Sequence, residues 1–192
     1  KHDAFISYSH GVDATLAADL ERGLERLAKP TFRLRAMDVF RDKSSLAAAP
    51  GLWSGIENHL SGSRWLLLMA SPGSAGSTWC SKEIAWWLEN RATSTILIVL
   101  TDGEVAWDEA AGDVDWGRTT ALPPSAAGRF RDDICARAAA QHANHPGRVD
   151  RDQRRIANGE GRRRSGCVAE VVETLRGDPH RVHVREQPCI LR

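Results

Sequence analysis

The sequence predicts an α/β fold with a central parallel sheet that helices cover on both faces. Four short β-prone runs alternate with segments of helical periodicity along residues 4–100. Two of these runs, 64–70 and 95–100, are apolar through their middle, as is typical of parallel strands that are buried on both faces. Because strands and helices alternate at this spacing, right-handed crossovers are expected to connect the strands.

Each expected element ends at a recognisable break. In the first helical segment, the leucines recur every three or four residues and form one apolar stripe, and Pro30 ends the segment. The segment from Asp42 to Gly51 is expected to be a loop, as is the acidic stretch 103–118. The expected strands are 4–8, 31–41, 64–70 and 95–100, and the expected helices are about 12–28, 52–60 and the segment that begins at 77.

The C-terminal third differs in composition from the rest of the chain. Residues 1–129 carry 13 Lys and Arg against 16 Asp and Glu, whereas residues 130–192 carry 13 against 9. We therefore divide the chain into a folded domain, 1–128, and an Arg-rich segment, 129–192. Within that segment, 136–166 is expected to be disordered or poorly packed, followed by an amphipathic helix near 166–177 and an edge strand at 181–185.

Composition excludes several functional classes. The net charge of +1 and the pI of about 7.9 give no indication of nucleic acid or a membrane surface as a partner. The four cysteines form no CxxC pair and have no histidines at zinc spacing, so reduced thiols and no metal are expected. No apolar run approaches the roughly 18–20 residues that cross a bilayer, and no signal segment opens the chain, so a cytoplasmic location is expected.

The stretch 77–83 (Ser-Thr-Trp-Cys-Ser-Lys-Glu) holds the strongest candidate site. It opens a helix directly after a predicted strand and a short breaker cluster, which is where α/β folds place their sites. Helical spacing gives one buried face (Cys80, Ile84, Trp87 and Leu88) and a second stripe on which Glu83 lies between two tryptophans (Trp79 and Trp86). The alternative is that Glu83 is a first-turn carboxylate that complements the helix dipole.

These segments together resemble a bacterial TIR domain (Toll/interleukin-1 receptor homology). The similarity rests on four boxes in the family's order and covers residues 3–102. The boxes are Asp-Ala-Phe-Ile-Ser-Tyr-Ser at 3–9, Val-Phe-Arg-Asp at 39–42 through Pro-Gly-Leu-Trp at 50–53, Leu-Leu-Leu-Met-Ala-Ser-Pro at 66–72, and Ser-x-Trp-Cys-x-x-Glu at 77–83.

The resemblance implies a flavodoxin-like TIR fold and cleavage of NAD+ at the nicotinamide–ribose bond. It implies that Glu83 is catalytic and that Ser9, His10, Trp53 and Trp79 contact the dinucleotide. Trp79 and Trp86 are expected to hold the carboxylate. NAD+ is then a substrate, with no further cofactor, and other TIR domains are partners through self-association. Family members of this kind act in antiviral or cell-suicide defence and are switched on by assembly.

Some alternatives remain open at this stage. The chain could be a non-catalytic TIR module that binds other TIR domains through its 42–51 loop, although the intact Trp-Cys-x-x-Glu start favours the enzyme. Trp53 could be a core residue and His10 an ordinary loop residue. The family also predicts a fifth strand and a closing helix after residue 124. The 129–192 segment could instead be a divergent extension, a partner-binding tail or the product of a shifted reading frame.

Overall fold

The computed structural model describes residues 1–27, 37–42 and 51–131. The order of the main elements confirms the alternation that the sequence predicts. The elements are β1 (His2–Ser7), α1 (Ala14–Leu27), β2 (Val39–Arg41), α2 (Leu52–Gly62), β3 (Ser63–Ala70), α3 (Pro72–Ala75), α4 (Thr78–Asn90), β4 (Ile96–Leu100), β5 (Trp107–Asp108) and β6 (Asp113–Val114), with short 3-10 turns at Thr93–Thr95 and Pro124–Ala126.

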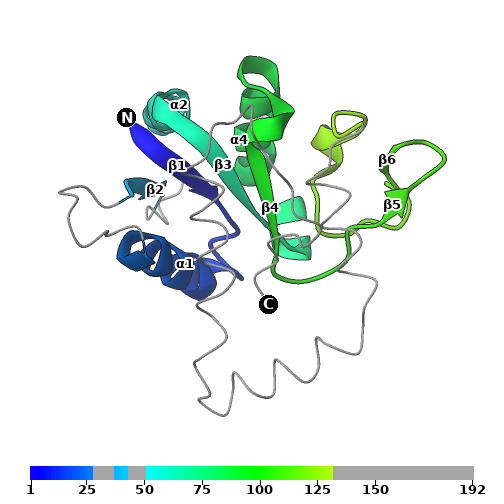
Figure 1. Ribbon diagram of the computed structural model, residues 1–192, viewed down its shortest axis with the longest axis horizontal. Coiled ribbons are helices and arrows are strands. Elements are labelled where there is room, and N and C mark those ends of the chain that lie inside the picture. The colour runs from blue at the N-terminus through cyan, green and yellow to red at the C-terminus, as the bar shows by residue number, and fades with distance from the viewer. Residues whose placement is uncertain (28–36, 43–50, 132–192) are drawn as a thin grey trace, which may run out of the picture.

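Four of the strands form one parallel sheet in the order β2-β1-β3-β4 (Figure 1). Phe5 of β1 lies opposite Phe40 of β2 and Leu66 of β3, and Leu66 in turn lies opposite Ile96 of β4. This is the strand order of flavodoxin-like folds, in which the chain reverses its direction of winding between β1 and β3. The expected fifth strand, closing helix, 136–166 stretch, 166–177 helix and 181–185 strand all lie outside the described residues.

Strand β3 divides the core into two layers because successive side chains of a strand point to opposite faces. Leu66 and Leu68 pack in the cluster that includes residues of α2 and α4. Trp65 and Leu67 pack in the cluster that includes Leu20 and other residues of α1. Both layers are buried, so the prediction of a central sheet with helices on both faces is confirmed (Figure 1).

The second strand is shorter than predicted. Strand β2 begins at Val39, and residues 31–36 of the expected strand lie outside the described residues. Asp38, just before β2, forms two hydrogen bonds with Asp3 of β1. Its amide donates to Asp3 Oδ2 at 2.9 Å, and its carbonyl accepts from the Asp3 amide at 2.7 Å. The Asp3 side chain therefore accepts from an amide that could otherwise bond to the backbone of the neighbouring strand.

The predicted breaker cluster after β3 contains a single helical turn, α3. Ser71 and Ser74 form a reciprocal capping box at its start, and Pro72 occupies the first turn, where a missing N–H is tolerated. This turn separates the end of β3 from the start of α4 and directs the chain back across the sheet.

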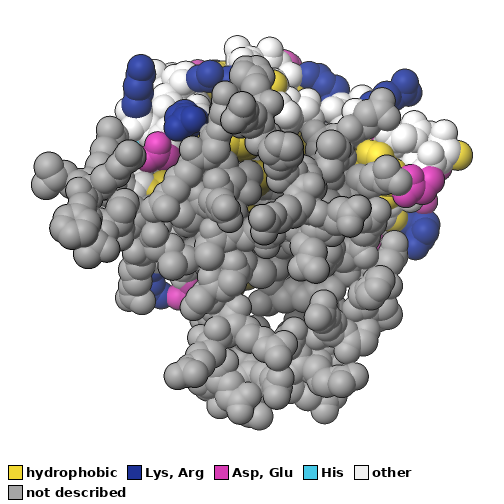
Figure 2. Space-filling model, in the orientation of Figure 1, with side chains coloured by type: hydrophobic (Ala, Val, Ile, Leu, Met, Phe, Trp, Pro, Cys, Tyr) yellow, Lys and Arg dark blue, Asp and Glu magenta, His cyan; other side chains and the backbone are white. Residues whose placement is uncertain are grey.

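The prediction that 103–118 is only a loop is wrong, because it contains the antiparallel β5–β6 hairpin. The Asp108 side chain accepts from the amides of Ala110 and Ala111, which stabilises the turn. Val114 is buried in the α2–α4 layer, which anchors the hairpin to the core. Figure 2 shows acidic and basic side chains side by side at this end of the molecule, where Glu104 and Arg118 form an ion pair at 3.0 Å.

In the part of the chain that the structure describes, none of the helices has the length and apolar character needed to cross a membrane.

Candidate active site

The carboxyl ends of the parallel strands converge on a buried carboxylate, Asp13, at the entrance to α1. Ser71, which follows β3, donates from Oγ to Asp13 Oδ2 at 2.7 Å. Thr101, which follows β4, donates from Oγ1 to Asp13 Oδ1 at 2.9 Å. Asp13 is only 3% exposed. It therefore fixes the ends of β3 and β4 against the segment that leaves β1, and this edge of the sheet is where ligands bind in open α/β folds.

Helix α4 begins beside this edge and carries Glu83. Ser77 caps the helix by accepting a hydrogen bond from the amide of Cys80 at 3.3 Å. The predicted buried face is confirmed, and Glu83 shares it. Because α4 starts at Thr78, Glu83 lies in the second turn and is only 6% exposed. The alternative of a first-turn carboxylate that complements the helix dipole is therefore wrong.

The side chain that holds Glu83 is Ser7, the last residue of β1. Ser7 Oγ donates to Glu83 Oε2 at 2.6 Å, within the ordinary range of a hydrogen bond between two oxygens. Both side chains are buried. Among the described residues, Ser7 supplies the hydrogen bond to the carboxylate, and the expectation that Trp79 and Trp86 hold it stays a prediction. Ser7 was missed as a site residue, although a polar residue that ends an apolar strand run was a visible signal.

Burial raises the pKa of Glu83 to about 8, the Ser7 hydrogen bond opposes this rise, and the charge of Asp42 adds to it. Asp42 lies at the end of β2. Burial likewise raises the pKa of the neighbouring Cys80 thiol to about 11, with the Glu83 charge as the next cause. Within the described residues, no ion pair reaches the Glu83 carboxylate. Burial and the Asp42 charge thus both disfavour the ionised form of Glu83 in the free protein.

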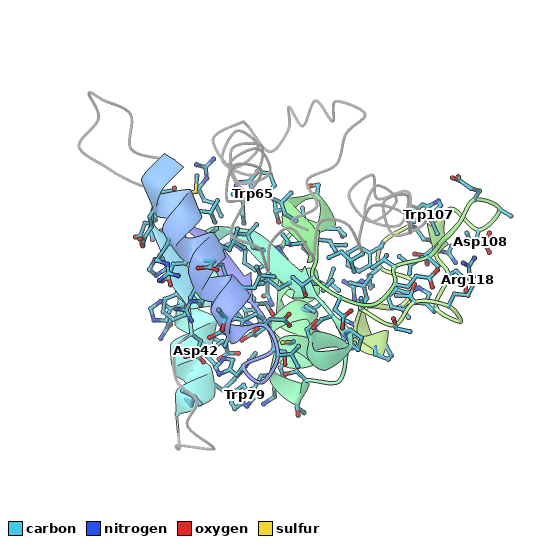
Figure 3. The ribbon with its side chains drawn as sticks, turned by 90° about the horizontal axis from the view of Figure 1, so that it is seen from below. Asp42, Trp65, Trp79, Trp107, Asp108 and Arg118 are labelled. Atoms are coloured by element: carbon cyan, nitrogen blue, oxygen red, sulfur yellow. The ribbon has the colours of Figure 1, made fainter. Side chains whose placement is uncertain are left out.

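Two tryptophans and a lysine lie together where α2 meets α4. The Trp53 and Trp79 rings are 6.2 Å apart, and Lys82 Nζ lies 4.8 Å from the Trp53 centroid and 5.6 Å from that of Trp79. Trp79 is 38% exposed, and Figure 3 shows it on the same side of the molecule as Asp42. Trp86, by contrast, packs at the edge of the core with its ring 6.4 Å from that of Trp87.

Ser9 and His10 lie on the segment that leaves β1. Ser9 is 9% exposed, and its Oγ would be 3.1 Å from a Cβ placed on Gly73, so α3 backs this residue closely. His10 is exposed and stacks on Tyr8, with ring centroids 4.7 Å apart and an interplanar angle of 15°. The structure therefore places both residues at the strand edge that holds Glu83. No contact joins either of them to Glu83 in the described residues.

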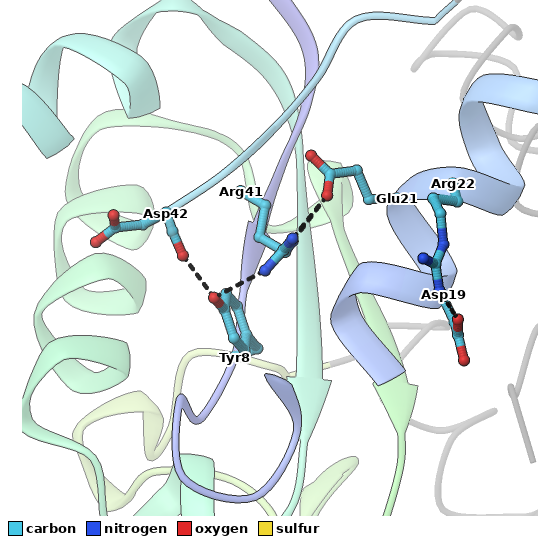
Figure 4. A network of polar contacts seen from close by, with 6 residues as sticks. All are labelled: Tyr8, Asp19, Glu21, Arg22, Arg41 and Asp42. Carbon is cyan, nitrogen blue, oxygen red and sulfur yellow. Dashed lines mark hydrogen bonds and ion pairs between the residues drawn. The ribbon is translucent and has the colours of Figure 1, made fainter. Parts of the chain in front are cut away.

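A polar network fixes the end of β2 next to the same edge (Figure 4). Arg41 donates to Glu21 of α1 at 2.9 Å and to the Tyr8 hydroxyl at 3.2 Å. The Tyr8 hydroxyl in turn donates to the Asp42 carbonyl at 2.5 Å. Glu21 is buried and Arg41 is half-buried. The network therefore holds the first residue of the 42–51 loop against β1 and α1.

The arrangement has few features of a metal centre. The described ranges bring no three metal-ligating side chains together, counting His, Cys, Asp and Glu. What they do bring together is one buried, hydrogen-bonded carboxylate, an aromatic pair and a set of hydroxyl groups at one edge of a parallel sheet.

A β2-β1-β3-β4 parallel sheet with a buried carboxylate beside the end of β1 defines a flavodoxin-like α/β protein with a site at its switch point. A family model described as "Thoeris protein ThsB, TIR-like domain" matches residues 5–105. The chain belongs to this family of TIR-like domains, which confirms the resemblance found in the sequence.

Comparison with individual proteins gives one relative of high identity and one solved structure of low similarity. The chain is 48% identical over 130 residues to "NAD(+) hydrolase ApTIR" of Actinoplanes sp., an alignment that covers 68% of this chain and 18% of that protein. The chain thus spans less than a fifth of that curated relative. Among solved structures it is similar to the TIR domains of the activated Roq1 resistosome that recognises the effector XopQ, with a TM-score of 0.42, 18% identity, and coverage of 91% of this chain and 83% of that one.

Proposed function

We propose that this chain is an NAD+ glycohydrolase that cleaves the nicotinamide–ribose bond, with Glu83 as its catalytic carboxylate. The observation that carries the proposal is Glu83 itself: a buried carboxylate without a cationic partner in the described residues, held by Ser7 at the carboxyl edge of the sheet. The 48% identity to a protein named as an NAD(+) hydrolase supports it. An interaction module would not need a carboxyl group in this place, because burying an ionisable group costs stability.

A single carboxylate is sufficient to catalyse cleavage of the nicotinamide–ribose bond. Nicotinamide departs as a neutral molecule, so it needs no general acid, and positive oxocarbenium-like charge develops on the ribose. A carboxylate fixed beside that ribose stabilises the charge and orients a ribose hydroxyl or the attacking water. Burial raises the pKa of Glu83 in the free protein, and the positive charge of the pyridinium substrate and of the developing cation favours the ionised form.

The remaining site residues take binding roles in this proposal. Ser9 and His10 would contact the dinucleotide where the chain leaves β1. Trp53 and Trp79 would provide the aromatic wall, and they already hold one cation, the Lys82 ammonium, within 6 Å. NAD+ is the substrate in this proposal and no separate cofactor is required.

Self-association is part of the same proposal. We expect the chain to act as a bacterial defence effector whose activity rises when TIR domains assemble. Specific activity should then increase with protein concentration. A monomer that is active by itself would instead have the same specific activity at every concentration. The rival function, a non-catalytic module that binds other TIR domains, predicts no turnover at any concentration.

The decisive experiment is nicotinamide release from NAD+ by wild-type protein, Glu83→Gln and a matched control, Glu89→Gln. Glu89 lies on the same helix but is exposed. Loss of the site charge should lower turnover by about 10²–10³-fold, as removal of one preorganised electrostatic group does in other enzymes. The Glu89 variant should retain wild-type turnover. Full activity of Glu83→Gln would reject the assignment, and an inert wild type would favour the interaction module.

A further inference from the structure

Ser7 ends strand β1 and reaches across the site to the carboxylate of Glu83. Its side chain is 1% exposed, and the Oγ–Oε2 distance is 2.6 Å. The two residues are 76 positions apart, so the contact forms only when β1 and α4 have packed together. We propose that Ser7 is a positioning residue: its hydroxyl anchors Oε2 of Glu83, so that Oε1 is the oxygen presented to the substrate ribose. This inference rests on the proposed NAD+ glycohydrolase function.

The two carboxylate oxygens of Glu83 have different surroundings. Oε2 accepts the Ser7 hydrogen bond, whereas no hydrogen bond reaches Oε1 from the residues that the structure describes. The side chain keeps 6% of its surface exposed. A carboxylate can accept on both oxygens. Oε1, which accepts no hydrogen bond from the described residues, is therefore the oxygen that a ribose hydroxyl or a developing positive charge can use.

The other groups around Glu83 cannot replace Ser7 in this task. Asp42, at the end of β2, is itself an acceptor whose charge opposes ionisation of Glu83. Cys80 precedes Glu83 on α4 and is a weak donor. Asp13, at the start of α1, already accepts from Ser71 and Thr101.

Loss of the Ser7 hydroxyl would affect Glu83 in two ways. The terminal torsion of a glutamate is broad, so a carboxylate without an anchor can rotate away from the orientation that the ribose needs. A hydrogen bond to the charged form also favours that form, so its removal would leave the carboxylate more often protonated. Both effects reduce turnover of bound substrate more than they reduce binding.

The test compares Ser7→Ala and Ser7→Cys with a matched control, Ser63→Ala. Ser63 is also a buried strand serine, but it lies at the start of β3 and donates to the His59 carbonyl at 2.7 Å. Two readouts are needed: kcat and KM for NAD+ across pH, and the ionisation of Glu83 without substrate. The second comes from the infrared band of a protonated carboxyl group that Glu83→Gln lacks.

For Ser7→Ala, we expect the ionisation midpoint of Glu83 and the acid limb of the pH profile to move upward by about one pH unit. At neutral pH kcat should then fall about tenfold or more, while KM changes by less than about twofold. Ser7→Cys keeps the volume with a weaker donor and should give intermediate values. Ser63→Ala should leave both readouts at wild-type values.

The outcomes separate this inference from the proposed function. An unchanged Glu83 midpoint and unchanged kcat in Ser7→Ala, in a wild-type background that cleaves NAD+, would overturn the role of Ser7 and leave the function intact. A shifted midpoint in a protein that never releases nicotinamide would support the Ser7–Glu83 coupling and reject the function. If Ser7→Ala does not fold, Ser7→Cys serves as the test. Wild-type kinetics and a wild-type Glu83 midpoint in Ser7→Cys would then overturn the proposal.

Discussion

Thr101 donates a 2.9 Å hydrogen bond to Asp13 although 88 residues separate the two. Thr101 follows β4 and Asp13 precedes α1, so this bond joins the two elements across the edge of the sheet where Glu83 lies. Ser71 donates to the other Asp13 oxygen at 2.7 Å. A single buried carboxylate thereby fixes three strand exits relative to one another.

Asp13→Ala should therefore destabilise the protein by about 2–3 kcal/mol, because it leaves the buried hydroxyl of Ser71 without its acceptor. Chemical denaturation monitored by tryptophan fluorescence measures the change. Asp19→Ala is the control, since Asp19 lies half-buried on the same helix in an ion pair with exposed Arg22. Its loss should cost under about 1 kcal/mol. Equal losses for the two variants would show that the Asp13 network contributes little.

Ionisation of Glu83 should make the wild-type protein less stable as pH rises. The folded pKa of about 8 exceeds the ordinary value of 4.5, so between these values the folded state binds more protons than the unfolded state. Unfolding free energy then falls by up to about 1.4 kcal/mol per pH unit in this window and levels off above pH 8.

Glu83→Gln removes this dependence, so its stability relative to wild type should increase from pH 5 to pH 8. Urea denaturation at several pH values measures the difference. The exposed Glu89→Gln change should give a constant offset across the same range. If the unfolding free energies of Glu83→Gln and wild type differ by the same amount at every pH, ionisation of Glu83 does not destabilise the folded protein.

Turnover should rise as Glu83 ionises, whereas the stability of the folded protein falls. If the ionised carboxylate stabilises the transition state, kcat/KM for NAD+ should rise with pH and level off above the free-enzyme pKa of about 8. Initial rates of nicotinamide release between pH 5.5 and pH 9.5 test this expectation. A rate that is already constant at pH 6 would contradict it.

Gly73 and Gly55 should respond differently to an added methyl group. A Cβ on Gly73 would lie 2.9 Å from Val12 Cγ2 and 3.1 Å from Ser9 Oγ. Gly73→Ala should thus displace the β1–α1 segment and raise KM for NAD+ several-fold, with a smaller effect on kcat. Calorimetric titration of the substrate into a Glu83→Gln background would measure binding apart from turnover.

Gly55 lies on the exposed face of α2, and a Cβ there would have no atom within 4 Å. Gly55→Ala should therefore stabilise the protein by about 0.5–1 kcal/mol, because alanine loses less backbone entropy in a helix. It should leave KM unchanged. A similar rise in KM for both variants would mean that Gly73 does not position the binding segment.

Local pattern alone determined the sheet, its helices and the candidate carboxylate. The apolar run of β3 and the helical spacing from Cys80 to Leu88 are local signals, since strand alternation and helix periodicity depend on near neighbours in the chain. The ordered motifs were sufficient for the family, and they indicated Glu83 as the candidate site residue. The same local reasoning assigned Glu83 to a stripe apart from the buried face and left a first-turn position open, whereas the structure buries it in the second turn.

Only the tertiary structure decided what surrounds that carboxylate. Three contacts near the site join residues that are 33 or more positions apart. They are the hydrogen bonds of Ser7 to Glu83, of Ser71 to Asp13 and of Arg41 to Tyr8. Periodicity indicates which face of an element is buried, but not which polar group from a distant strand meets it there. Burial raises the pKa of Glu83, and burial depends on the packing of β1 against α4, which no single stretch of the sequence contains.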